Sequence, residues 1–377
     1  MRLFFVTGSL VHGGAERHTL TLANRLAERG HEVDFAYVKN DPSQLPRLQV
    51  PGVCLHARSY LDWRAIESLK ERLRKTRPSV VVAANQYALM YARLAMRGLS
   101  APLLVTYHTT LLRNAREWLQ MLWYRPFFWS ADRLVFVCEA QRRHWRVRGV
   151  AGRRNEVIYN GVDLEHWKPT DTTPIRGVLG IDEKDFVIGM SAVLRPEKNH
   201  LQLVEAVARL RRRGIAACAL LIGDGEMRGA IEQRARSLGV APAVIVTGLQ
   251  KDVRPLVGAC DAMALCSTAV ETFSLAALEA MALARPVVHS DIGGAKEMIQ
   301  PGHDGFLFPV NDTGTLVEKL AVLADPALRR ELGANARRTV EARFTERAMV
   351  DRYERILTEL AATRSKRDDL RRRATAH

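Results

Sequence analysis

The sequence predicts an α/β protein with two parallel, doubly wound sheets, each in its own domain. The first observation is the length, because 377 residues suit two domains. The second is the alternation of short apolar runs with longer amphipathic segments, which is typical of strand–helix units. The third is a polar interruption near residue 165, after which the alternation starts again. With 47% hydrophobic and 26% charged residues, the composition is globular and excludes wholesale disorder.

In the first half, each short apolar run is followed by a helical pattern. Strands are expected at residues 3–7, 32–38, 79–83, 103–107 and 134–138. The first helix is expected over residues 15–29, and Gly30 and His31 end it. These units predict a Rossmann-like domain over residues 1–165.

A polar stretch, residues 168–174, holds two prolines and separates the halves. Beyond it we expect strands at 186–190, 219–222, 244–247, 262–266 and 286–289, with helices at 200–213, 227–238 and 275–284. A second Rossmann-like domain is therefore predicted over residues 166–345. Residues 346–377 are predicted to hold a C-terminal helix over 346–360 and a basic surface tail.

The chain is strongly basic, with a formal net charge of +15. Most of the excess belongs to residues 1–165, whose net charge is +11, against +4 for residues 166–377. Such an excess indicates a phosphate-bearing partner: a nucleotide, a nucleic acid or an anionic membrane surface. The densest runs are residues 72–77 and 142–148, and solvated helix faces remain an alternative explanation for both.

Cysteine usage and hydropathy favour a cytoplasmic protein. The five cysteines are scattered without a C-x-x-C or zinc spacing, which predicts reduced, buried thiols. The N-terminal apolar run is too short for a signal peptide. No stretch of about 18 apolar residues occurs, so we expect no membrane-spanning segment.

Gly13 and Gly14 follow the first strand and open the first helix. Glycines let a backbone approach a ligand closely, and a helix N-terminus attracts anions. The pattern favours a ligand-binding loop, although a tight turn without ligand has the same letters. Since the spacing is not G-x-G-x-x-G, a dinucleotide fingerprint is absent.

Arg195 and Lys198 lie in the loop after the first strand of the second half. Two cations at the carboxyl edge of a parallel sheet suit a diphosphate, because open α/β sheets bind ligands at that edge. The alternative is a surface loop in which Pro196 opens a helix.

The strongest motif is a pair of carboxylates eight positions apart, Glu271 and Glu279. The first precedes a helix expected from Ser274 and the second lies inside it, so both are predicted to face one cleft. Carboxylates accept hydrogen bonds from sugar hydroxyls, and free N–H groups at a helix start receive phosphate. A purely structural helix does not account for Glu279, because an unpaired carboxylate in an apolar run is costly.

Along nearly the whole chain, in order, the sequence resembles the retaining glycosyltransferases of the GT-B fold, family 4. The resemblance rests on these elements: the Gly-Gly loop, 106–108, 158–163, 195–198, 223–225, 247–248, the carboxylate pair, 291–294 with Glu297, and 305–307. It implies GT-B architecture, two Rossmann-like parallel-sheet domains facing across a cleft. It also implies a nucleoside-diphosphate sugar as donor substrate, with no further cofactor.

The resemblance implies roles for the residues of the carboxylate motif. Glu271 would touch hydroxyls of the donor sugar, and Glu279 would hold the ribose hydroxyls of the nucleotide. Phe273, Ser274 and Leu275 would offer main-chain N–H groups to sugar and phosphate.

It also implies roles outside that motif. Arg195 and Lys198 would neutralise the departing diphosphate, and His108 would line the sugar pocket from the N-terminal domain. Gly13 and Gly14 would belong to the donor-binding set. The family usually has an arginine where this chain has Val193, and Arg195 is the candidate to supply that charge.

No metal is expected to take part, because no D-x-D motif lies on a suitable loop. Two cations and helix N-termini supply the electrostatic stabilisation of the leaving group in this interpretation. The implied reaction retains the anomeric configuration, and the leaving phosphate takes the acceptor proton.

The acceptor is harder to predict from sequence. Residues 117–129 are rich in aromatics and lie in the basic half. They suit a membrane interface or a lipid-linked acceptor, or else a helix that buries its aromatics in the core. The resemblance favours a glycan or lipid-linked acceptor in lipopolysaccharide or exopolysaccharide biosynthesis, with the protein peripheral on the inner face of the cytoplasmic membrane.

Two other functions suit parts of the sequence. A sugar-nucleotide 2-epimerase shares the two-domain fold, but the placement of the carboxylate pair argues against it. The charge of +15 also suits a nucleic-acid-binding protein, yet no binding-motif signature supports one, and we expect no nucleic-acid partner.

Overall fold

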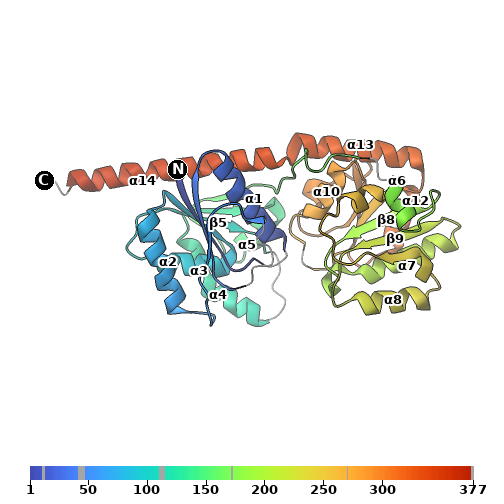
Figure 1. The fold of residues 1–377 in the computed structure, drawn as a ribbon, viewed down its shortest axis with the longest axis horizontal. Coiled ribbons are helices and arrows are strands. Elements are labelled where there is room, and N and C mark those ends of the chain that lie inside the picture. Colours follow the sequence, from blue (N-terminus) through green and yellow to red (C-terminus); the bar gives the residue numbers. More distant parts are fainter. Residues whose placement is uncertain (11–12, 41–46, 110–114, 171–172, 270, 375–377) are drawn as a thin grey trace. The chain divides into compact units, whose positions relative to one another are not determined.

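The computed structural model describes residues 1–10, 13–40, 47–109, 115–170, 173–269 and 271–374 (Figure 1). It confirms the predicted fold class, because the described strands form two parallel sheets flanked by helices. The chain divides into two compact units: Met1–Tyr159 with Arg347–His377, here unit 1, and Asn160–Glu346, here unit 2. Each unit therefore has one sheet.

Unit 1 has seven strands in the order β3-β2-β1-β4-β5-β6-β7. Their bounds are β1 (Arg2–Thr7), β2 (Glu32–Tyr37), β3 (Gly52–Cys54), β4 (Val80–Ala84), β5 (Leu103–Tyr107), β6 (Arg133–Phe136) and β7 (Asn155–Val157). The helices are α1 (Gly14–Glu28), α2 (Trp63–Thr76), α3 (Asn85–Ala95), α4 (Ala115–Trp129), α5 (Glu139–Arg146) and α14 (Glu346–Ala374).

Unit 2 has six strands in the order β10-β9-β8-β11-β12-β13. They are β8 (Phe186–Ser191), β9 (Ala217–Ile222), β10 (Val244–Val246), β11 (Ala262–Leu265), β12 (Val287–Ser290) and β13 (Gly305–Phe308). The helices are α6 (Thr173–Val178), α7 (His200–Arg212), α8 (Arg228–Ser237), α9 (Arg254–Ala259), α10 (Leu275–Ala282), α11 (Ala295–Met298), α12 (Thr313–Val322) and α13 (Pro326–Arg343), with short 3-10 turns η2 (Pro196–Lys198) and η3 (Ala241–Ala243).

The strands absent from the sequence prediction are β3, β7 and β13, and all three lie at sheet edges. Each has three or four residues, and each includes partly exposed positions. A strand at an edge pairs on one side only, so its sequence is shorter and less apolar than that of a central strand.

The C-terminal helix is longer than predicted and belongs to unit 1. α14 runs over Glu346–Ala374, and Met349, Tyr353 and Leu357 join the apolar core formed by α1 and one face of the sheet (Figure 1). Two ion pairs fix it there, since Arg29 lies 2.6 Å from both Asp351 and Glu354. The C-terminal helix, which the sequence analysis assigned to a separate segment, therefore belongs to the N-terminal unit.

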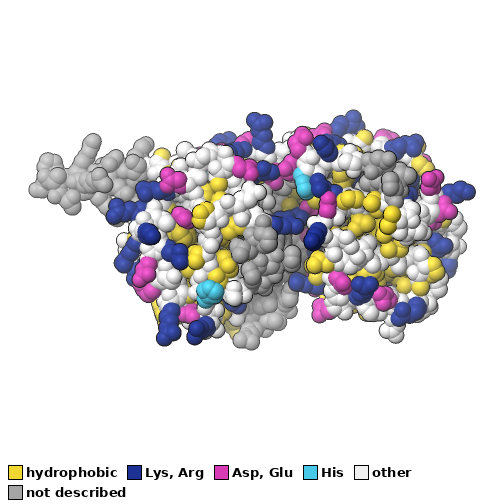
Figure 2. All heavy atoms as spheres, viewed as in Figure 1, with side chains coloured by type: hydrophobic (Ala, Val, Ile, Leu, Met, Phe, Trp, Pro, Cys, Tyr) yellow, Lys and Arg dark blue, Asp and Glu magenta, His cyan; other side chains and the backbone are white. Residues whose placement is uncertain are grey.

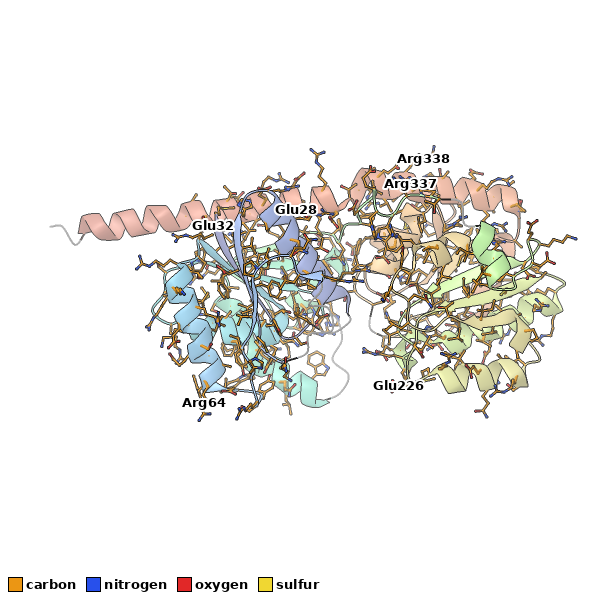
Figure 3. All side chains as sticks on the ribbon, viewed as in Figure 1. Glu28, Glu32, Arg64, Glu226, Arg337 and Arg338 are labelled. Carbon is orange, nitrogen blue, oxygen red and sulfur yellow. The ribbon has the colours of Figure 1, made fainter. Side chains whose placement is uncertain are left out.

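The basic run at residues 72–77 lies on α2. This helix buries Ala65, Ile66, Leu69 and Leu73, whereas Arg72, Arg74 and Lys75 are exposed. Lys and Arg side chains are visible over α2 in Figure 2, and Arg64 projects from its first turn in Figure 3. The run is therefore a solvated helix face, the alternative considered above.

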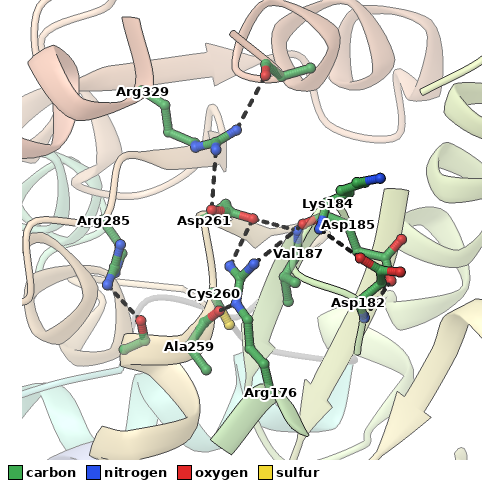
Figure 4. Close-up of polar contacts among 12 residues, drawn as sticks. Arg176, Asp182, Lys184, Asp185, Val187, Ala259, Cys260, Asp261, Arg285 and Arg329 are labelled. Atoms are coloured by element: carbon green, nitrogen blue, oxygen red, sulfur yellow. Dashed lines mark hydrogen bonds and ion pairs between the residues drawn. The ribbon is translucent and has the colours of Figure 1, made fainter. Parts of the chain in front are cut away.

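At the amino edge of the unit 2 sheet, a carboxylate ties several elements together (Figure 4). Asp261, just before β11, accepts from Val187 N (2.8 Å) and pairs with Arg176 of α6 (2.9 Å) and Arg329 of α13 (3.3 Å). Arg337 of α13, labelled in Figure 3, donates to Ala282 O at the end of α10 (2.6 Å). These bonds hold the helices against the sheet on the side opposite the candidate site. Among the described residues, no helix has the length and apolarity needed to cross a membrane.

Candidate functional site

Two loops meet at the carboxyl edge of the unit 2 sheet. One follows β8 and the other follows β11, which are neighbouring strands, so their ends lie side by side. Lys198 Nζ lies 2.6 Å from Glu271 Oε2, and Thr268 N donates to Glu197 O (2.9 Å). The structure thus brings together two residues that the sequence placed 73 positions apart.

Glu271 is an ionised carboxylate in a mostly buried position. Its side chain is 13% exposed, and Ser267 Oγ donates to Oε2 (3.0 Å) beside Lys198. Burial by itself raises the pKa of Glu271, but the charge of Lys198 and these hydrogen bonds outweigh burial and hold the pKa below its usual value. A carboxylate held in this way is ready to accept hydrogen bonds from hydroxyl groups.

His289 adds a residue that sequence reasoning missed. It lies on β12, is 1% exposed, and interacts electrostatically with Glu271. Burial lowers the pKa of His289 more than the Glu271 charge raises it, so the ring is neutral at pH 7. A histidine at the end of an apolar strand was the available signal, but sequence does not show what it faces.

Glycines allow the backbone of neighbouring loops to touch the site. Gly293 has φ of +60°, and a Cβ there would lie 2.0 Å from Glu271 O. Gly294 N donates to Thr272 O (2.7 Å), and Thr272 lies next to Glu271 in the loop after β11. Gly225, in the loop after β9, likewise allows contact with Leu194, where a Cβ would lie 2.6 Å from Leu194 O. Larger residues would displace the loops that hold Glu271 and Lys198.

The helix after Glu271 begins as predicted. Ser274 caps α10, its Oγ accepting from Ala277 N (3.3 Å), and Leu275 is the first helical residue. The Phe273 ring packs against Phe344 (centroids 5.4 Å apart), and Phe273 O accepts from Asn160 Nδ2 (3.0 Å). Glu279 lies inside α10 and is 6% exposed.

The two cations of the β8 loop are placed differently. Lys198 pairs with Glu271, whereas the Arg195 side chain is exposed and forms no ion pair with the residues that the structure describes. Val193 is 39% exposed in the same loop. The structure therefore joins Lys198 to the carboxylate and leaves Arg195 exposed to solvent.

In unit 1, Gly13 is the N-cap of α1 and Gly14 is the first helical residue. Nearby is a cavity of about 350 Å³ at the carboxyl edge of the sheet. Its lining comes from β1, α1, α3 and α4 and includes Thr7, Glu16, Lys39, Gln86, Tyr87 and Tyr124. Burial raises the pKa of Glu16. The cavity thus combines aromatic rings with polar groups of both signs.

Polar atoms in this lining lack partners among the described residues. Gln86 Oε1 and the Tyr87 hydroxyl are buried without a hydrogen bond, and Lys39 Nζ lies 5.2 Å from the centre of the Tyr87 ring. Buried polar atoms in proteins are nearly always satisfied. Both atoms are shielded from solvent, so Gln86 and Tyr87 line the cavity through their other atoms.

His108 follows β5, and its main-chain N donates to Asn85 Oδ1 (2.9 Å). Its ring lies 4.5 Å from that of His18 of α1, which lies 5.4 Å from Tyr353 of α14 (centroid distances). Burial lowers the pKa of His108 to about 4 and that of His18 well below its usual value, so both rings are neutral at pH 7. Sequence reasoning did not single out His18.

The described residues contain no group of three or more His, Cys, Asp or Glu placed to hold a metal ion. The described cysteines are free thiols, and four of the five are buried. Burial raises the pKa of Cys260 and Cys266 to about 12, so these thiols are unreactive packing residues.

Two parallel Rossmann-like sheets with polar loops at their carboxyl edges define the GT-B class, and the comparisons agree with it. Residues 12–166 match the model "Glycosyltransferase Family 4", and residues 171–339 match "Glycosyl transferases group 1". Each model matches less than half of the chain, and the two matches together support a GT-B glycosyltransferase of family 4.

Two relatives show how far the sequence similarity extends. N-acetyl-alpha-D-glucosaminyl L-malate synthase of Bacillus anthracis is 32% identical over 53% of this chain and 52% of that protein, so the match spans about half its length. A UDP-Gal:alpha-D-GlcNAc-diphosphoundecaprenol alpha-1,3-galactosyltransferase of Escherichia coli is 23% identical over 84% of each chain.

Among solved structures, Anabaena Alr3699/HepE in complex with UDP superposes with a TM-score of 0.87 at 22% identity, over 95% of this chain and all of that one (100%). At this identity the likeness establishes the fold alone. It agrees with the two-sheet architecture derived above.

Proposed function

We propose that this protein is a retaining glycosyltransferase that moves a sugar from a nucleoside diphosphate to a glycan or lipid-linked acceptor. The observation that carries the proposal is the Lys198–Glu271 pair, 2.6 Å apart at the carboxyl edge of the unit 2 sheet. Ligands bind at this edge in open α/β sheets. The pair supplies a cation for a diphosphate and a carboxylate for sugar hydroxyls.

In the proposed reaction, the bond between sugar C1 and the diphosphate oxygen breaks while a bond from C1 to an acceptor oxygen forms on the same face. The acceptor proton passes to the leaving phosphate oxygen. Lys198 and Arg195 stabilise the negative charge of the leaving group, together with main-chain N–H groups at the start of α10. No protein nucleophile and no metal ion is assigned to the reaction.

Donor binding would rearrange the pair. In this structure Lys198 Nζ forms an ion pair with Glu271 Oε2. A bound diphosphate would attract Lys198 away from Glu271, and the carboxylate could then accept hydrogen bonds from sugar hydroxyls. Arg195, exposed on the same loop, has room to reach the phosphate. Glu279, inside α10, is assigned to the ribose.

We assign the acceptor to the cavity of unit 1. Its polar side chains, among them Glu16, Lys39 and Gln120, and its tyrosine rings suit a carbohydrate head group, because sugars combine hydroxyls with apolar faces. The Escherichia coli relative is named for a diphosphoundecaprenol acceptor. We therefore favour envelope glycan assembly at the inner face of the cytoplasmic membrane.

A donor screen tests the reaction. Purified protein is incubated with UDP-, GDP- and ADP-sugars, and nucleoside diphosphate release is measured with and without EDTA. Release from one donor that EDTA does not alter supports the proposal. Activity that EDTA abolishes and Mg²⁺ restores would refute the metal-free mechanism. No release from any donor, together with binding of nucleic acid that salt weakens, would favour the nucleic-acid alternative.

Matched variants test the two carboxylates. Glu279→Gln should weaken calorimetric binding of the free nucleoside diphosphate, because its assigned partner is the ribose. Glu271→Gln should leave that affinity nearly intact while turnover collapses, because its assigned partner is the sugar. Equal loss of nucleotide affinity in both variants would reject the assignment.

A further inference from the structure

A second cavity lies at the amino edge of the unit 1 sheet. Its volume is about 370 Å³, and its lining includes Leu103 and Arg133, the first residues of β5 and β6. The cavity assigned to the acceptor is instead lined by Thr7 and Ala84, the last residues of β1 and β4. The two cavities therefore lie at opposite edges of one sheet, and the reaction proposed above uses no residue of the second.

The second cavity, here called the arginine cavity, is lined by four arginines and by one carboxylate, that of Asp132. The arginines come from separate elements: Arg93 of α3, Arg133 of β6, and Arg153 and Arg154 of the loop before β7. Like charges around one cavity repel one another, and a bound anion would relieve this repulsion.

Asp132 does not neutralise the whole set, because local groups already bind both of its oxygens. Oδ1 accepts from Arg153 Nη1 (2.9 Å), and Oδ2 accepts from Leu103 N (2.9 Å). Arg93 and Arg154 are exposed, and neither forms an ion pair with a residue that the structure describes. Two guanidinium groups of the arginine cavity are therefore available to a ligand.

Arg133 is the buried cation of the arginine cavity, at 8% exposure. It lies 3.1 Å from Glu156 and 3.3 Å from Glu359 of α14, a helix that also lines the cavity through Leu360 and Thr363. The Glu359 side chain is 63% exposed, and a carboxylate so exposed contributes little to an ion pair. An anion in the cavity would therefore compete with Glu359 for Arg133.

The uneven charge of the sequence agrees with an anion site in this unit. Residues 1–165 have a net charge of +11, which indicates a phosphate-bearing partner. The cations assigned to the donor diphosphate, Arg195 and Lys198, belong to unit 2. The proposed reaction thus leaves the positive excess of unit 1 without a partner.

We propose that the arginine cavity binds a small molecule through a diphosphate group. Arg93 and Arg154 would each bind one phosphate, because a planar guanidinium donates two parallel hydrogen bonds to phosphate oxygens. Arg133 would add a third, buried positive charge. This site is separate from the donor site, since it belongs to unit 1 and lies at the amino edge of its sheet.

Calorimetry with inorganic pyrophosphate tests the site. Arg93→Gln with Arg154→Gln should weaken binding about tenfold or more, because hydrogen bonds between charged groups are strong. Arg72→Gln with Arg74→Gln is the matched control, since it removes the same charge from the exposed face of α2 and should bind like the wild type. All four side chains are exposed, so both double variants should unfold at the urea concentration of the wild type.

A second variant should change the affinity in the opposite direction. Glu359→Gln removes the carboxylate that competes for Arg133 and should strengthen pyrophosphate binding about two- to fivefold. Glu71→Gln on α2 is the control, because it removes the same charge from another exposed position of unit 1 and should have no such effect. Damage to the fold would not produce tighter binding.

The donor site of unit 2 can also attract pyrophosphate, and Lys198→Met separates the two sites. Binding at the arginine cavity should persist in Lys198→Met and should be lost in Arg93→Gln with Arg154→Gln. Binding that is lost in Lys198→Met and unchanged in the double variant would overturn the proposal. Nucleoside diphosphate release from the donor, without added pyrophosphate, should persist in the double variant, so a failure of this site and a failure of the proposed reaction are distinguishable.

The diphosphate group could belong to free pyrophosphate or to a nucleotide. In Lys198→Met with Glu279→Gln, whose donor site is weakened, UDP binding as tight as that of pyrophosphate or tighter would support a nucleotide ligand. Much weaker UDP binding would support free pyrophosphate. Binding of neither compound to this variant would overturn the proposal.

Discussion

Each edge of the unit 2 sheet has a carboxylate that pairs with a cation, but the two carboxylates differ in how many elements they join. At the amino edge, Asp261 accepts one main-chain N–H and pairs with two arginines from separate helices. At the carboxyl edge, Glu271 has one lysine and one serine hydroxyl, all on loops. The amino edge is a closed network that joins elements. At the carboxyl edge, Glu271 and Lys198 bind each other and could instead bind a ligand.

The largest effect should come from breaking the amino edge. Asp261→Ala leaves Arg176 and Arg329, each 18% exposed, without their shared carboxylate. Breaking a buried pair in this way costs about 3–5 kcal/mol of unfolding free energy. Urea unfolding measures it, and turnover per folded molecule should stay near that of the wild type. A loss of turnover with unchanged stability would reverse the roles of the two edges.

The next effect concerns the carboxyl edge. Lys198→Met should lower kcat about a hundredfold or more, because a lost transition-state cation costs about 2–4 kcal/mol. Stability should change less than in Asp261→Ala, since Lys198 is a loop residue that is 24% exposed. The matched control is Lys296→Met, whose side chain is 71% exposed on α11 and should be nearly silent. Full activity of Lys198→Met would remove the lysine from the mechanism.

Glycine variants sharpen the comparison through backbone shape. Gly293→Ala places a Cβ 2.0 Å from Glu271 O, whereas Gly302→Ala meets nothing within 4 Å. Both glycines have positive φ, +60° and +80°, so both variants carry a similar strain of about 1–2 kcal/mol. Only Gly293→Ala should also lower kcat/KM, by about tenfold, because it moves the Glu271 loop. Equal kinetic losses in the two variants would contradict this account.

The last effect is a pH dependence of stability at the carboxyl edge. His200, the first residue of α7, is 2% exposed, and burial with the Lys198 charge lowers its pKa to about 4. The unfolded ring titrates near 6.5, so its contribution is complete above that pH and is lost as pH falls from 6.5 toward 4. Between pH 7 and 5 the loss is about 2 kcal/mol.

His200→Leu should therefore reduce the loss of unfolding free energy between pH 7 and pH 5 relative to the wild type. Urea unfolding at both pH values measures this difference. His303→Leu is the control, because His303 is an exposed loop residue of the same unit. An unchanged pH slope in His200→Leu would show that other groups govern acid stability.

Much of the candidate site could be predicted from the sequence, because the strands of a parallel sheet have their carboxyl ends at one edge. Loops after β8 and β11 were predicted to carry Lys198 and Glu271, and the structure joins the two side chains. The sequence around Ser274 also predicted the start of α10, which Ser274 caps. Such features depend on local sequence and strand order, which periodicity reveals.

Other features needed the three-dimensional structure. His289 approaches Glu271 from a third strand, and His18 approaches His108 from a helix 90 positions earlier. Arg195 and Lys198 look equivalent in sequence, yet one is exposed and the other pairs with Glu271. Rotamer direction and loop packing decide such contacts, and neither is written in a local pattern.

The sequence alone determined the fold class, the two sheets and the loops that hold the candidate site, because hydrophobic periodicity and chain order depend on nearby residues. Tertiary structure decided the rest. It assigned α14 to unit 1, added the edge strands, and split the α4 aromatics into a buried and an exposed face. These outcomes depend on which surfaces remain uncovered after every element has packed, a property of the whole fold and not of any single segment.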